Sequence, residues 1–543
     1  MTLSRRPRSR SLRMLAVAMA AALALSACGG DDGDNDGDND GDGGGGGDTS
    51  LVLGLPSFFV TNFAPGGTGS SNIDYAVWTP LTTIEAGTGE LGPGVAEEWA
   101  SEDQKTWTVT LQDGWTFHDG SPVTAQSFVD SWNATATAAN ALNGNAQMNI
   151  IEGYEEMNPA KGEPSATELS GLEVVDELTL EVTLNAPNTL FPYLIANPVF
   201  APLPEGAADD LKSFATNPIG NGPYMFRDGG FGAGDQDVYL VPYEDYAGTP
   251  ANVDEIDLRI YQDPSSIYTD FQAGSLDLAL LDGDNLATAK QEYPEQVVDV
   301  SFPALIYLGF PAYDDRFTPE IRQAISMAID REAIVDGLLQ GNGTPATGLA
   351  PDVLEGGGEA ACASCTFDPD GAKAALDAAG GWDGDLVLYT YQDPTNERIL
   401  EAVTNQIRSN LGIEGVTFEA LPIEQLYERF GAQSIDGPSL AYAGAAFPHL
   451  YALADQMLNP GQLLNVTGYD NEEFTSAMES AVTEASSIED TTEQVRAAVD
   501  LALADAPVAP LFWPRGGLVH SESVSGVVPE FLGGARLALL EVS

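Results

Sequence analysis

The 543-residue sequence contains little histidine, cysteine and positive charge. It has 3 histidines and 3 cysteines, and 21 Lys and Arg residues stand against 82 Asp and Glu residues, giving a formal net charge of -61. This excess of acid argues against a nucleic-acid partner and against a surface for anionic lipid. The histidines, His118, His449 and His520, are isolated in the sequence, so no imidazole metal cluster is predicted. We expect neither a metal nor a cofactor.

Three cysteines are too few for a disulfide framework or a zinc module. Cys362 and Cys365 lie in a glycine-rich loop rather than in a βαβ redox unit, so we predict a short structural disulfide instead of a thioredoxin-like redox pair. The sequence also lacks a Gly-x-Ser-x-Gly nucleophile elbow, and carboxylates are too abundant for any two to be nominated as a catalytic pair. His118-Asp119-Gly120 is typical of a tight turn. We therefore predict that the protein is not an enzyme.

The amino terminus predicts a secretion signal. Five arginines between positions 5 and 13 precede the apolar run "MLAVAMAAALAL", which is shorter than the ~20 residues needed to cross a bilayer. The tetrapeptide Leu25-Ser26-Ala27-Cys28 resembles the bacterial lipobox, in which a signal peptidase cuts before a cysteine that carries a lipid. The resemblance implies that residues 1–27 are removed and that Cys28 is lipidated. The location implied is the outer face of the cytoplasmic membrane, reached through the lipid anchor alone.

Residues 28–49 are rich in Gly and Asp. The spacing Asp32-x-Asp34-x-Asp36-Gly37 copies the start of an EF-hand loop, but position 12 of that loop is Gly43, and no helix pattern flanks it. Gly/Asp segments bury no apolar surface that could offset the entropy of ordering. We predict a disordered acidic tether over 28–49 rather than a calcium site.

The body of the chain begins near Leu51, and its length suggests about three lobes. The alternation of Trp107, Val109 and Leu111 predicts a strand, and Thr124 is the expected N-cap of the helix that follows. Further patterns predict strands over 178–184, 237–243, 254–261 and 385–391, and helices over 265–274, 318–339, 369–381 and 396–413. This interleaving of strands and helices predicts an α/β fold.

Several of these segments, in this order, resemble the peptide/nickel family (family 5) of extracellular solute-binding proteins of ABC transporters. The block 94–132, "GVAEEWASEDQKTWTVTLQDGWTFHDGSPVTAQSFVDSW", is similar to the family's signature, and "NPIGNGPYMF" (217–226) is similar to its Gly-Thr-Gly-Pro-Tyr turn. "FQAGSLDLALL", "YLGF", "IRQAISMAIDREAIV" and "FDPDGAKAALDAAG" also match. The resemblance runs from about residue 50 to the end of the chain.

The resemblance implies a two-lobed type II periplasmic-binding-protein clamshell with an extra domain inserted in the first lobe. Carried onto this chain, the first lobe would use residues 50–84, 217–302 and 508–543, the inserted domain 85–216, and the second lobe 303–507. A small-molecule or peptide ligand would lie between the closing lobes. The closed form would dock on an ABC permease in the membrane, and a monomer is expected.

Aromatic and polar side chains are expected to line this cleft, where they offer stacking surfaces. The predicted ligand-binding residues are Phe58, Phe59, Asn62, Tyr442, Phe447, His449, Phe512 and Trp513.

One segment departs from the family pattern. Peptide-binding members carry a Trp-x-x-Asp-Tyr segment whose aspartate accepts the ligand's ammonium, but residues 442–448 of this chain read "YAGAAFP" and contain no acid. A buried ammonium without a charge partner is costly, so the departure puts ordinary peptide binding in doubt unless Asp282, Asp284 or Asp455 substitutes. The ligand thus stays open between a peptide, a modified or cationic peptide, an oligosaccharide and another amphiphilic solute. A secreted hydrolase and a cleft-based sensor without transport are the alternative functions.

Overall fold

A 12-stranded mixed sheet organises the body of the chain, with the strand order β16-β15-β17-β13-β18-β11-β1-β10-β9-β8 and with β12 and β14 also paired to β18. The structure is a computed structural model. It describes residues 49–56, 62–67, 71–227, 230–231, 237–281, 283–358 and 362–543. The predicted signal peptide, Cys28 and almost all of the predicted tether lie outside the described residues.

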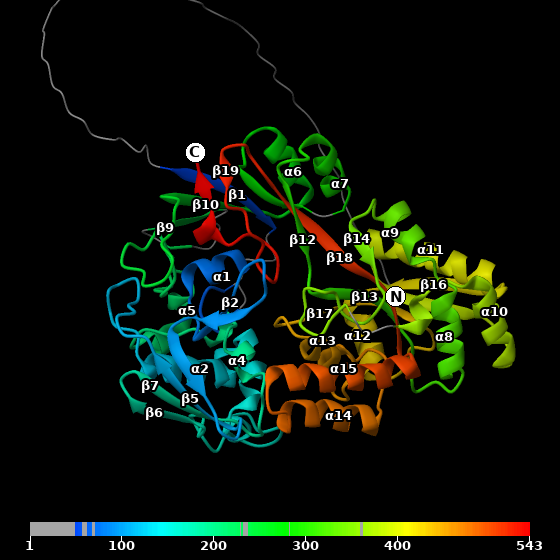
Figure 1. The fold of residues 1–543 in the computed structure, drawn as a ribbon, viewed down its shortest axis with the longest axis horizontal. Helices are drawn as coiled ribbons and strands as arrows, with labels where there is room; N and C mark the ends of the chain where they lie inside the picture. Colours follow the sequence, from blue (N-terminus) through cyan, green and yellow to red (C-terminus); the bar gives the residue numbers. More distant parts are fainter. Residues whose placement is uncertain are drawn as a thin grey trace, which may run out of the picture. The chain divides into compact units, whose positions relative to one another are not determined.

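The long strand β18 (Val508–His520) belongs to both halves of this sheet (Figure 1). Its first residues pair with β13 (Ala304–Gly309) and β14 (Gly343–Pro345), and its later residues pair with β11 (Leu278–Leu281) and β12 (Val297–Ser301), all antiparallel. We call the half that contains β1 and β8–β12 the first lobe, and the half that contains β13–β17 the second lobe. The strand therefore runs from one lobe into the other.

The first lobe begins with β1 (Ser50–Pro56), which pairs in parallel with β10 (Glu255–Tyr261) and β11. Leu51, Leu53 and Leu55 recur with the period of two that puts side chains on one face of a strand, and all three are buried. The other elements of this lobe are β8 (Tyr224–Phe226), β9 (Asp237–Pro242), β19 (Val524–Ser525), β20 (Glu541–Val542), α1 (Ser71–Val77), α6 (Ser265–Gln272), α7 (Gly283–Glu292) and a 3-10 turn (Leu537–Leu539). The predicted strands over 237–243 and 254–261 and the predicted helix over 265–274 are confirmed.

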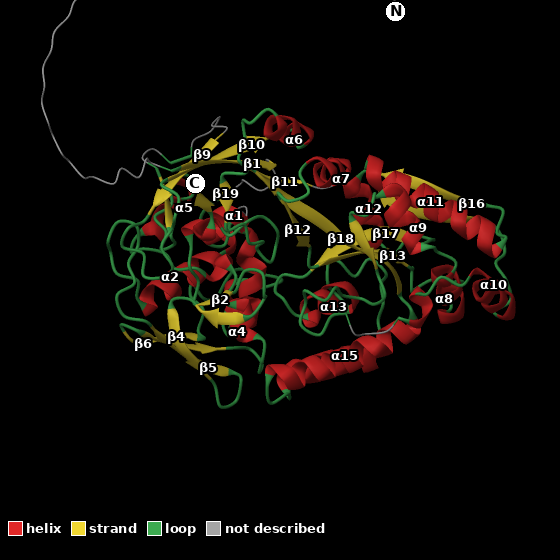
Figure 2. Cartoon of the chain, turned by 45° about the horizontal axis from the view of Figure 1, so that its top comes forward, coloured by secondary structure: helices red, strands yellow, loops and turns green. Residues whose placement is uncertain are grey.

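The second lobe places helices around strands β13, β15 (Leu386–Tyr391), β16 (Val416–Leu421) and β17 (Ser439–Gly444). α11 (Pro394–Leu411) begins at Asp393, whose carboxylate accepts hydrogen bonds from two backbone N–H groups, and ends at Gly412 in the left-handed region. This lobe also contains α10 (Pro369–Ala378), α12 (Ile423–Gly431), α13 (Leu450–Leu458), α14 (Glu472–Thr483), α15 (Ile488–Asp505) and a 3-10 turn (Ala363–Cys365). Figure 2 shows α11 and α12 beside the strands of this lobe. The predicted strand over 385–391 and the predicted helices over 369–381 and 396–413 are confirmed.

The prediction of one unbroken helix over 318–339 is wrong, because the segment forms α8 (Pro319–Met327) and α9 (Arg331–Leu338). Asp330 caps the second helix, since its side chain accepts a hydrogen bond from the backbone N–H of Ala333 at 2.9 Å. The buried guanidinium of Arg331 donates to the backbone oxygens of Ser326 and Ile329, which satisfies carbonyls freed where the first helix ends. Burial lowers the pKa of Arg331 to about 10.

A separate four-stranded sheet, in the order β4-β5-β7-β6, lies between β3 and β8 in the chain. Phe128 and Trp132 of its helix α2 are buried, as their spacing of four predicts, and the predicted strands around 107–111 and over 178–184 are confirmed. We call this group the inserted part. It contains β4 (Ala96–Ala100), β5 (Thr106–Leu111), β6 (Leu172–Asp176), β7 (Thr179–Thr183), α2 (Ala125–Ala136), α3 (Tyr154–Met157), α4 (Phe191–Leu194), α5 (Leu211–Phe214) and 3-10 turns at 138–140, 143–150, 198–200 and 207–210, and the hairpin β2 (Thr82–Ile84) and β3 (Leu91–Pro93) precedes it.

The inserted part also packs directly against the second lobe. The Thr189 hydroxyl lies 2.7 Å from the Thr491 hydroxyl of α15, and the Thr189 N–H donates to the Val482 carbonyl at 3.0 Å. Leu190 and Tyr193 share one buried apolar cluster with residues of α13 and α15. The residue bounds predicted for the three parts, 85–216 for the insertion among them, stay predictions.

Candidate binding site

An apolar pocket of about 560 Å³ lies where the second lobe meets the strand crossing between the lobes. Its walls come from the end of β15, from α12, from β17 and the residues after it, from the loop before α14, from the β12–β13 connection and from the carboxy-terminal segment. The fifteen lining residues are Phe302, Pro303, Tyr391, Ile423, Leu426, Tyr427, Phe430, Leu440, Ala441, Tyr442, Gly444, Ala445, Leu464, Val466 and Leu532. We call it the cleft pocket.

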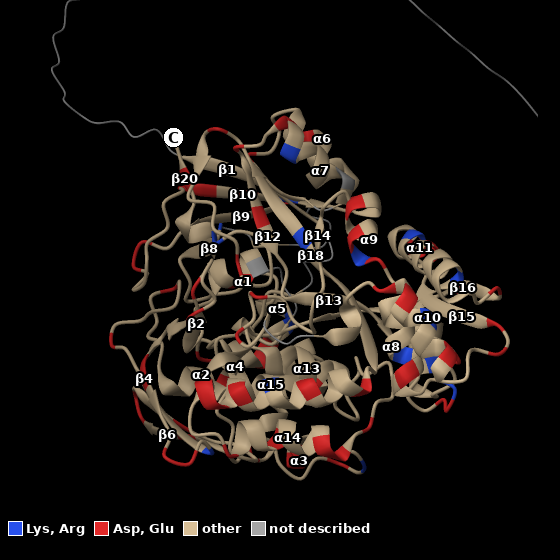
Figure 3. Ribbon diagram, turned by 45° about the vertical axis from the view of Figure 1, so that its right-hand side comes forward, with Lys and Arg blue, Asp and Glu red and all other residues tan. Residues whose placement is uncertain are grey.

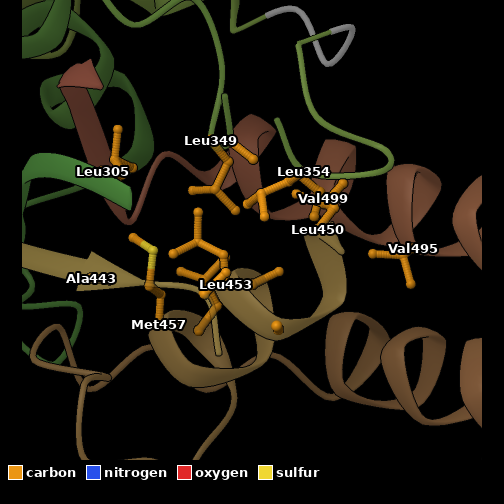
Figure 4. Close-up of a cluster of buried hydrophobic side chains, with 14 of the residues drawn as sticks. Leu305, Leu349, Leu354, Ala443, Leu450, Leu453, Met457, Val495 and Val499 are labelled. Carbon is orange, nitrogen blue, oxygen red and sulfur yellow. The ribbon is translucent and has the colours of Figure 1, made fainter. Parts of the chain in front are cut away.

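Strand β17 directs Tyr442 into this pocket. Its neighbour Ala443 is fully buried on the opposite face, in the cluster that Figure 4 shows with Leu305, Leu453 and Met457. The Tyr442 side chain is 53% exposed. A Cβ atom added at Gly444 would lie 2.9 Å from the Tyr442 hydroxyl, so glycine leaves the space that the tyrosine occupies.

Helix α12 supplies a second wall of the pocket. Ile423, Leu426, Tyr427 and Phe430 are spaced three and four residues apart, so they share one face of the helix, and all four line the pocket. The rings of Tyr427 and Phe430 meet edge to face with centroids 5.8 Å apart. Our sequence analysis missed this helix, although its spacing could have revealed it.

The crossing between the lobes closes the pocket on a third side. Phe302 and Pro303 connect β12 of the first lobe to β13 of the second lobe. The Phe302 ring packs against the backbone of the last part of the chain, where a Cβ atom at Gly516 or Gly533 would lie 2.8 or 2.7 Å from it. Leu532 lies between β19 and β20 of the first lobe, so the pocket wall contains residues of both lobes.

Ala445 belongs to the segment 442–448, in which the family pattern leads one to expect an aspartate. It is buried, lines the pocket, and donates its backbone N–H to the Pro303 carbonyl at 2.8 Å. Of the acids that could replace the aspartate, Asp282 and the side chain of Asp284 lie outside the described residues. Asp455 of α13 accepts hydrogen bonds from Asn459 and Gln462, and it is not among the residues that line the pocket. Burial raises the pKa of Asp455.

Phe447 and His449 come a few residues after Tyr442, but both are buried. The Phe447 ring stacks on Tyr193 of the inserted part, with centroids 6.1 Å apart and planes 21° apart. His449 caps α13: its Nδ1 accepts the Tyr451 N–H at 3.0 Å, so Nε2 carries the proton and donates to the Thr492 hydroxyl at 3.0 Å. Burial lowers the pKa of His449 to about 4, so the ring is neutral. These contacts are structural, and a role for the two residues in ligand binding stays a prediction.

The remaining predicted site residues do not line the cleft pocket or lie outside the described residues. Phe512 is buried in β18 opposite Ile306 and Pro345, and Trp513 is partly buried against the core of the second lobe. The Asn62 side chain accepts the Ala64 N–H at 3.0 Å. Phe58 and Phe59 lie outside the described residues, so Tyr442 is the predicted side chain that the structure brings to the pocket.

Cys362 and Cys365 form a disulfide with a Cα–Cα distance of 5.2 Å, and both residues are buried.

His118 is also held by neighbouring backbone. Its Nδ1 accepts the Gly220 N–H, its Nε2 donates to the Gly222 carbonyl, and burial lowers its pKa to about 4. Within the described ranges, no three His, Cys, Asp or Glu side chains gather to hold a metal ion. The same ranges contain no helix long and apolar enough to span a membrane.

Acidic residues are spread over many elements of the ribbon in Figure 3, and basic residues are few. The cleft pocket differs from this surface, since none of its fifteen lining residues carries a charge. A two-lobed α/β fold with an uncharged pocket at the crossing of its lobes is the architecture of a binding protein for small solutes.

Comparison with known families identifies the chain. Residues 90–436 match the model of the bacterial extracellular solute-binding proteins, family 5 (middle part), and the chain belongs to this family. The resemblance drawn from the signature segments is thereby confirmed.

Curated relatives cover most of the chain. The dipeptide-binding protein DppE of Bacillus subtilis (strain 168) is 26% identical over 84% of this chain and 86% of its own length. The oligopeptide-binding protein OppA of the same organism is 25% identical over 82% and 84%. A heme-binding protein A of Haemophilus influenzae is 25% identical over 62% of this chain and 63% of its own length. The hydrolase and sensor alternatives find no support among these names.

Solved structures confirm the predicted two-lobed mixed α/β fold. The unliganded open form of the murein tripeptide binding protein MppA aligns with a TM-score of 0.79 at 21% identity, covering 91% of this chain and 97% of that one. HbpA2 from Haemophilus parasuis aligns with a TM-score of 0.77 at 22% identity, covering 91% of this chain and all of the other.

Proposed function

We propose that this protein is the extracytoplasmic receptor of an ABC importer and captures a peptide-like or other small amphiphilic solute between its two lobes. The observation that carries the proposal is the composition of the cleft pocket, whose walls join the second lobe to the crossing at Phe302 and Pro303 and to Leu532. A solute held there would touch residues of both lobes. The named activities of the relatives, which bind dipeptides, oligopeptides or heme, support the same class of function.

Binding by lobe closure needs no covalent step. The strand β18 and the β12–β13 connection cross between the lobes, and a few residues at such crossings can absorb the change in backbone angles when domains close. A solute favours the closed form only if it makes more contacts there, and apolar surface buried on closure contributes about 25 cal/mol per Å². The protein acts as a carrier in this scheme, without enzymatic activity and without a cofactor.

The location proposed for the receptor is the outer face of the cytoplasmic membrane. A lipid on Cys28 would hold it there, and residues 28–49 would tether the body as a monomer within reach of the permease. The basic amino-terminal region, the short apolar run and the Leu-Ser-Ala-Cys sequence support this anchoring.

Native mass spectrometry on the full chain, purified gently from cells that produce it, tests the proposal. We expect one bound small molecule per protein chain, and we expect cells that lack the gene to lose uptake of that molecule. A protein that carries no adduct from any growth medium would contradict the receptor function, and so would unchanged uptake of the bound molecule after deletion.

A further inference from the structure

We infer that the ligand of this protein inserts an uncharged, bulky apolar or aromatic group into the cleft pocket, and that no ammonium–carboxylate pair holds it there. This inference rests on the proposed receptor function and adds the chemical class of the solute. In terms of peptides, the occupant is one with an aromatic or large aliphatic side chain whose amine is blocked or lies outside this pocket.

The first argument is the charge of the pocket walls. Charged residues make up 19% of the chain, so fifteen residues drawn at random would include about three, whereas the pocket lining includes none. In a chain with a formal net charge of -61, this is a distinctly neutral surface. A charged group placed against it would lose its hydration without gaining a charged partner, which disfavours binding.

The second argument is the exposure of apolar side chains at the pocket. Among the described residues, nine large hydrophobic side chains are exposed, and four of them line this one pocket: Ile423 at 46%, Tyr427 at 36%, Tyr442 at 53% and Leu532 at 38%. Soluble proteins rarely leave apolar side chains gathered in one place unless something binds there. A ligand that covers these four residues removes their apolar surface from water.

The third argument is the type of polar group that the pocket offers. Tyr391, Tyr427 and Tyr442 bring phenol hydroxyls, which can donate or accept a hydrogen bond without requiring a charge on the ligand. Their rings also provide faces for stacking. At Ala445 the wall presents a methyl group and no carboxylate that could pair with an amine.

The size of the pocket sets the size of the group. A volume of about 560 Å³ falls inside the range of roughly 300–1,000 Å³ typical of small-molecule sites. The pocket therefore suits a small solute or a few residues of a short peptide, and not a folded partner.

Isothermal titration calorimetry on the full-length protein with a matched peptide panel tests the inference. The panel consists of di- to pentapeptides that differ at one position between Phe, Leu, Lys and Glu, each with a free or an acetylated amine. We expect the Phe and Leu peptides to bind at least tenfold more tightly than the Lys and Glu peptides of the same length. Acetylation of the amine should change the dissociation constant less than threefold.

Two exposed pocket residues and one neighbour provide the variants. Tyr442→Ala and Tyr427→Ala should weaken binding of the best Phe peptide at least tenfold. Leu463→Ala is the matched control, because Leu463 is 78% exposed, precedes the lining residue Leu464, and does not line the pocket itself. Ala445→Asp should strengthen binding of the free-amine peptides relative to the acetylated ones at least tenfold, and its melting temperature shows whether it folds.

The outcomes separate this inference from the receptor function. Tighter binding of Lys or Glu peptides, or a tenfold loss on acetylation, overturns the inference and leaves the receptor function standing. If Tyr442→Ala and Tyr427→Ala bind the best Phe peptide as tightly as the unsubstituted protein does, the inference is also overturned. If no peptide binds and the native protein carries a charged solute, the inference fails alone; if the native protein carries no solute at all, both proposals fail.

Discussion

Tyr442 and His449 are seven positions apart, yet the structure uses them in opposite ways. Tyr442 lies within strand β17 and lines the uncharged cleft pocket, where about half of its surface is exposed. His449 is fully buried, caps a helix and donates a hydrogen bond to Thr492 of α15. The comparison teaches that one short segment serves two interfaces. Its first half lines the cleft pocket, and its second half joins the second lobe to the inserted part.

The largest effect expected from this comparison is on stability. His449→Ala removes the cap of α13 and leaves a cavity beside Thr492, so we expect the free energy of unfolding to fall by about 3 kcal/mol. Tyr442→Ala should change it by less than about 0.5 kcal/mol, because the side chain is half exposed. Denaturant titration followed by tryptophan fluorescence measures both. Equal losses in the two variants would remove the distinction between the two halves of the segment.

The pH dependence of stability offers a second, smaller effect. The pKa of His449 is about 4 in the folded protein and near 6.5 in an unfolded chain. The unfolded chain binds the proton first as pH falls, so the stability contributed by the neutral ring is complete above pH 6.5 and is lost toward pH 4. In His449→Gln, the loss of stability between pH 7 and pH 4.5 should be smaller by about 2 kcal/mol than in the parent protein. If the free energy of unfolding falls by the same amount with pH in the parent protein and in His449→Gln, the His449 ring is not neutral and buried.

The disulfide between Cys362 and Cys365 sharpens the comparison at the buried half. Both cysteines lie in the same apolar cluster as Phe447. The bridge closes a very short loop, so replacing both cysteines by serine should lower the free energy of unfolding by up to about 2 kcal/mol. The peptide affinity of the cleft pocket should stay within twofold of the parent value in the calorimetric titration. A large loss of affinity with little loss of stability would show that the loop serves the pocket rather than the core.

Much of this arrangement could be predicted from the sequence, where periodicity and turn chemistry are local. The alternation of Trp107, Val109 and Leu111 and the cap at Thr124 specify a strand and a helix without help from the rest of the chain. The break between α8 and α9 also has a local sequence signal, because Asp330 can cap the helix that follows it. We missed it because the apolar stripe continues across the break.

The roles of residues 442–449 could not be predicted in the same way. The resemblance to the family indicated the segment, but the period of two ends with the strand at Gly444. The turn that follows buries Phe447 against Tyr193, a residue more than 250 positions earlier in the chain. Likewise, the spacing on α12 predicts an apolar face, but only the fold shows that this face lines a pocket instead of a core. Contacts between distant segments decide both cases.

The position of β18 near the end of the chain has a consequence for how the protein folds. This strand pairs with β11, β12, β13 and β14, which precede it by roughly 160 to 240 residues, so neither half of the large sheet is complete until the last part of the chain has been made. A nascent chain that lacks Val508–His520 exposes unpaired strand edges. During synthesis the large sheet therefore remains incomplete until almost the whole chain has been made. An incompletely folded polypeptide is one that can still be threaded through a secretion channel.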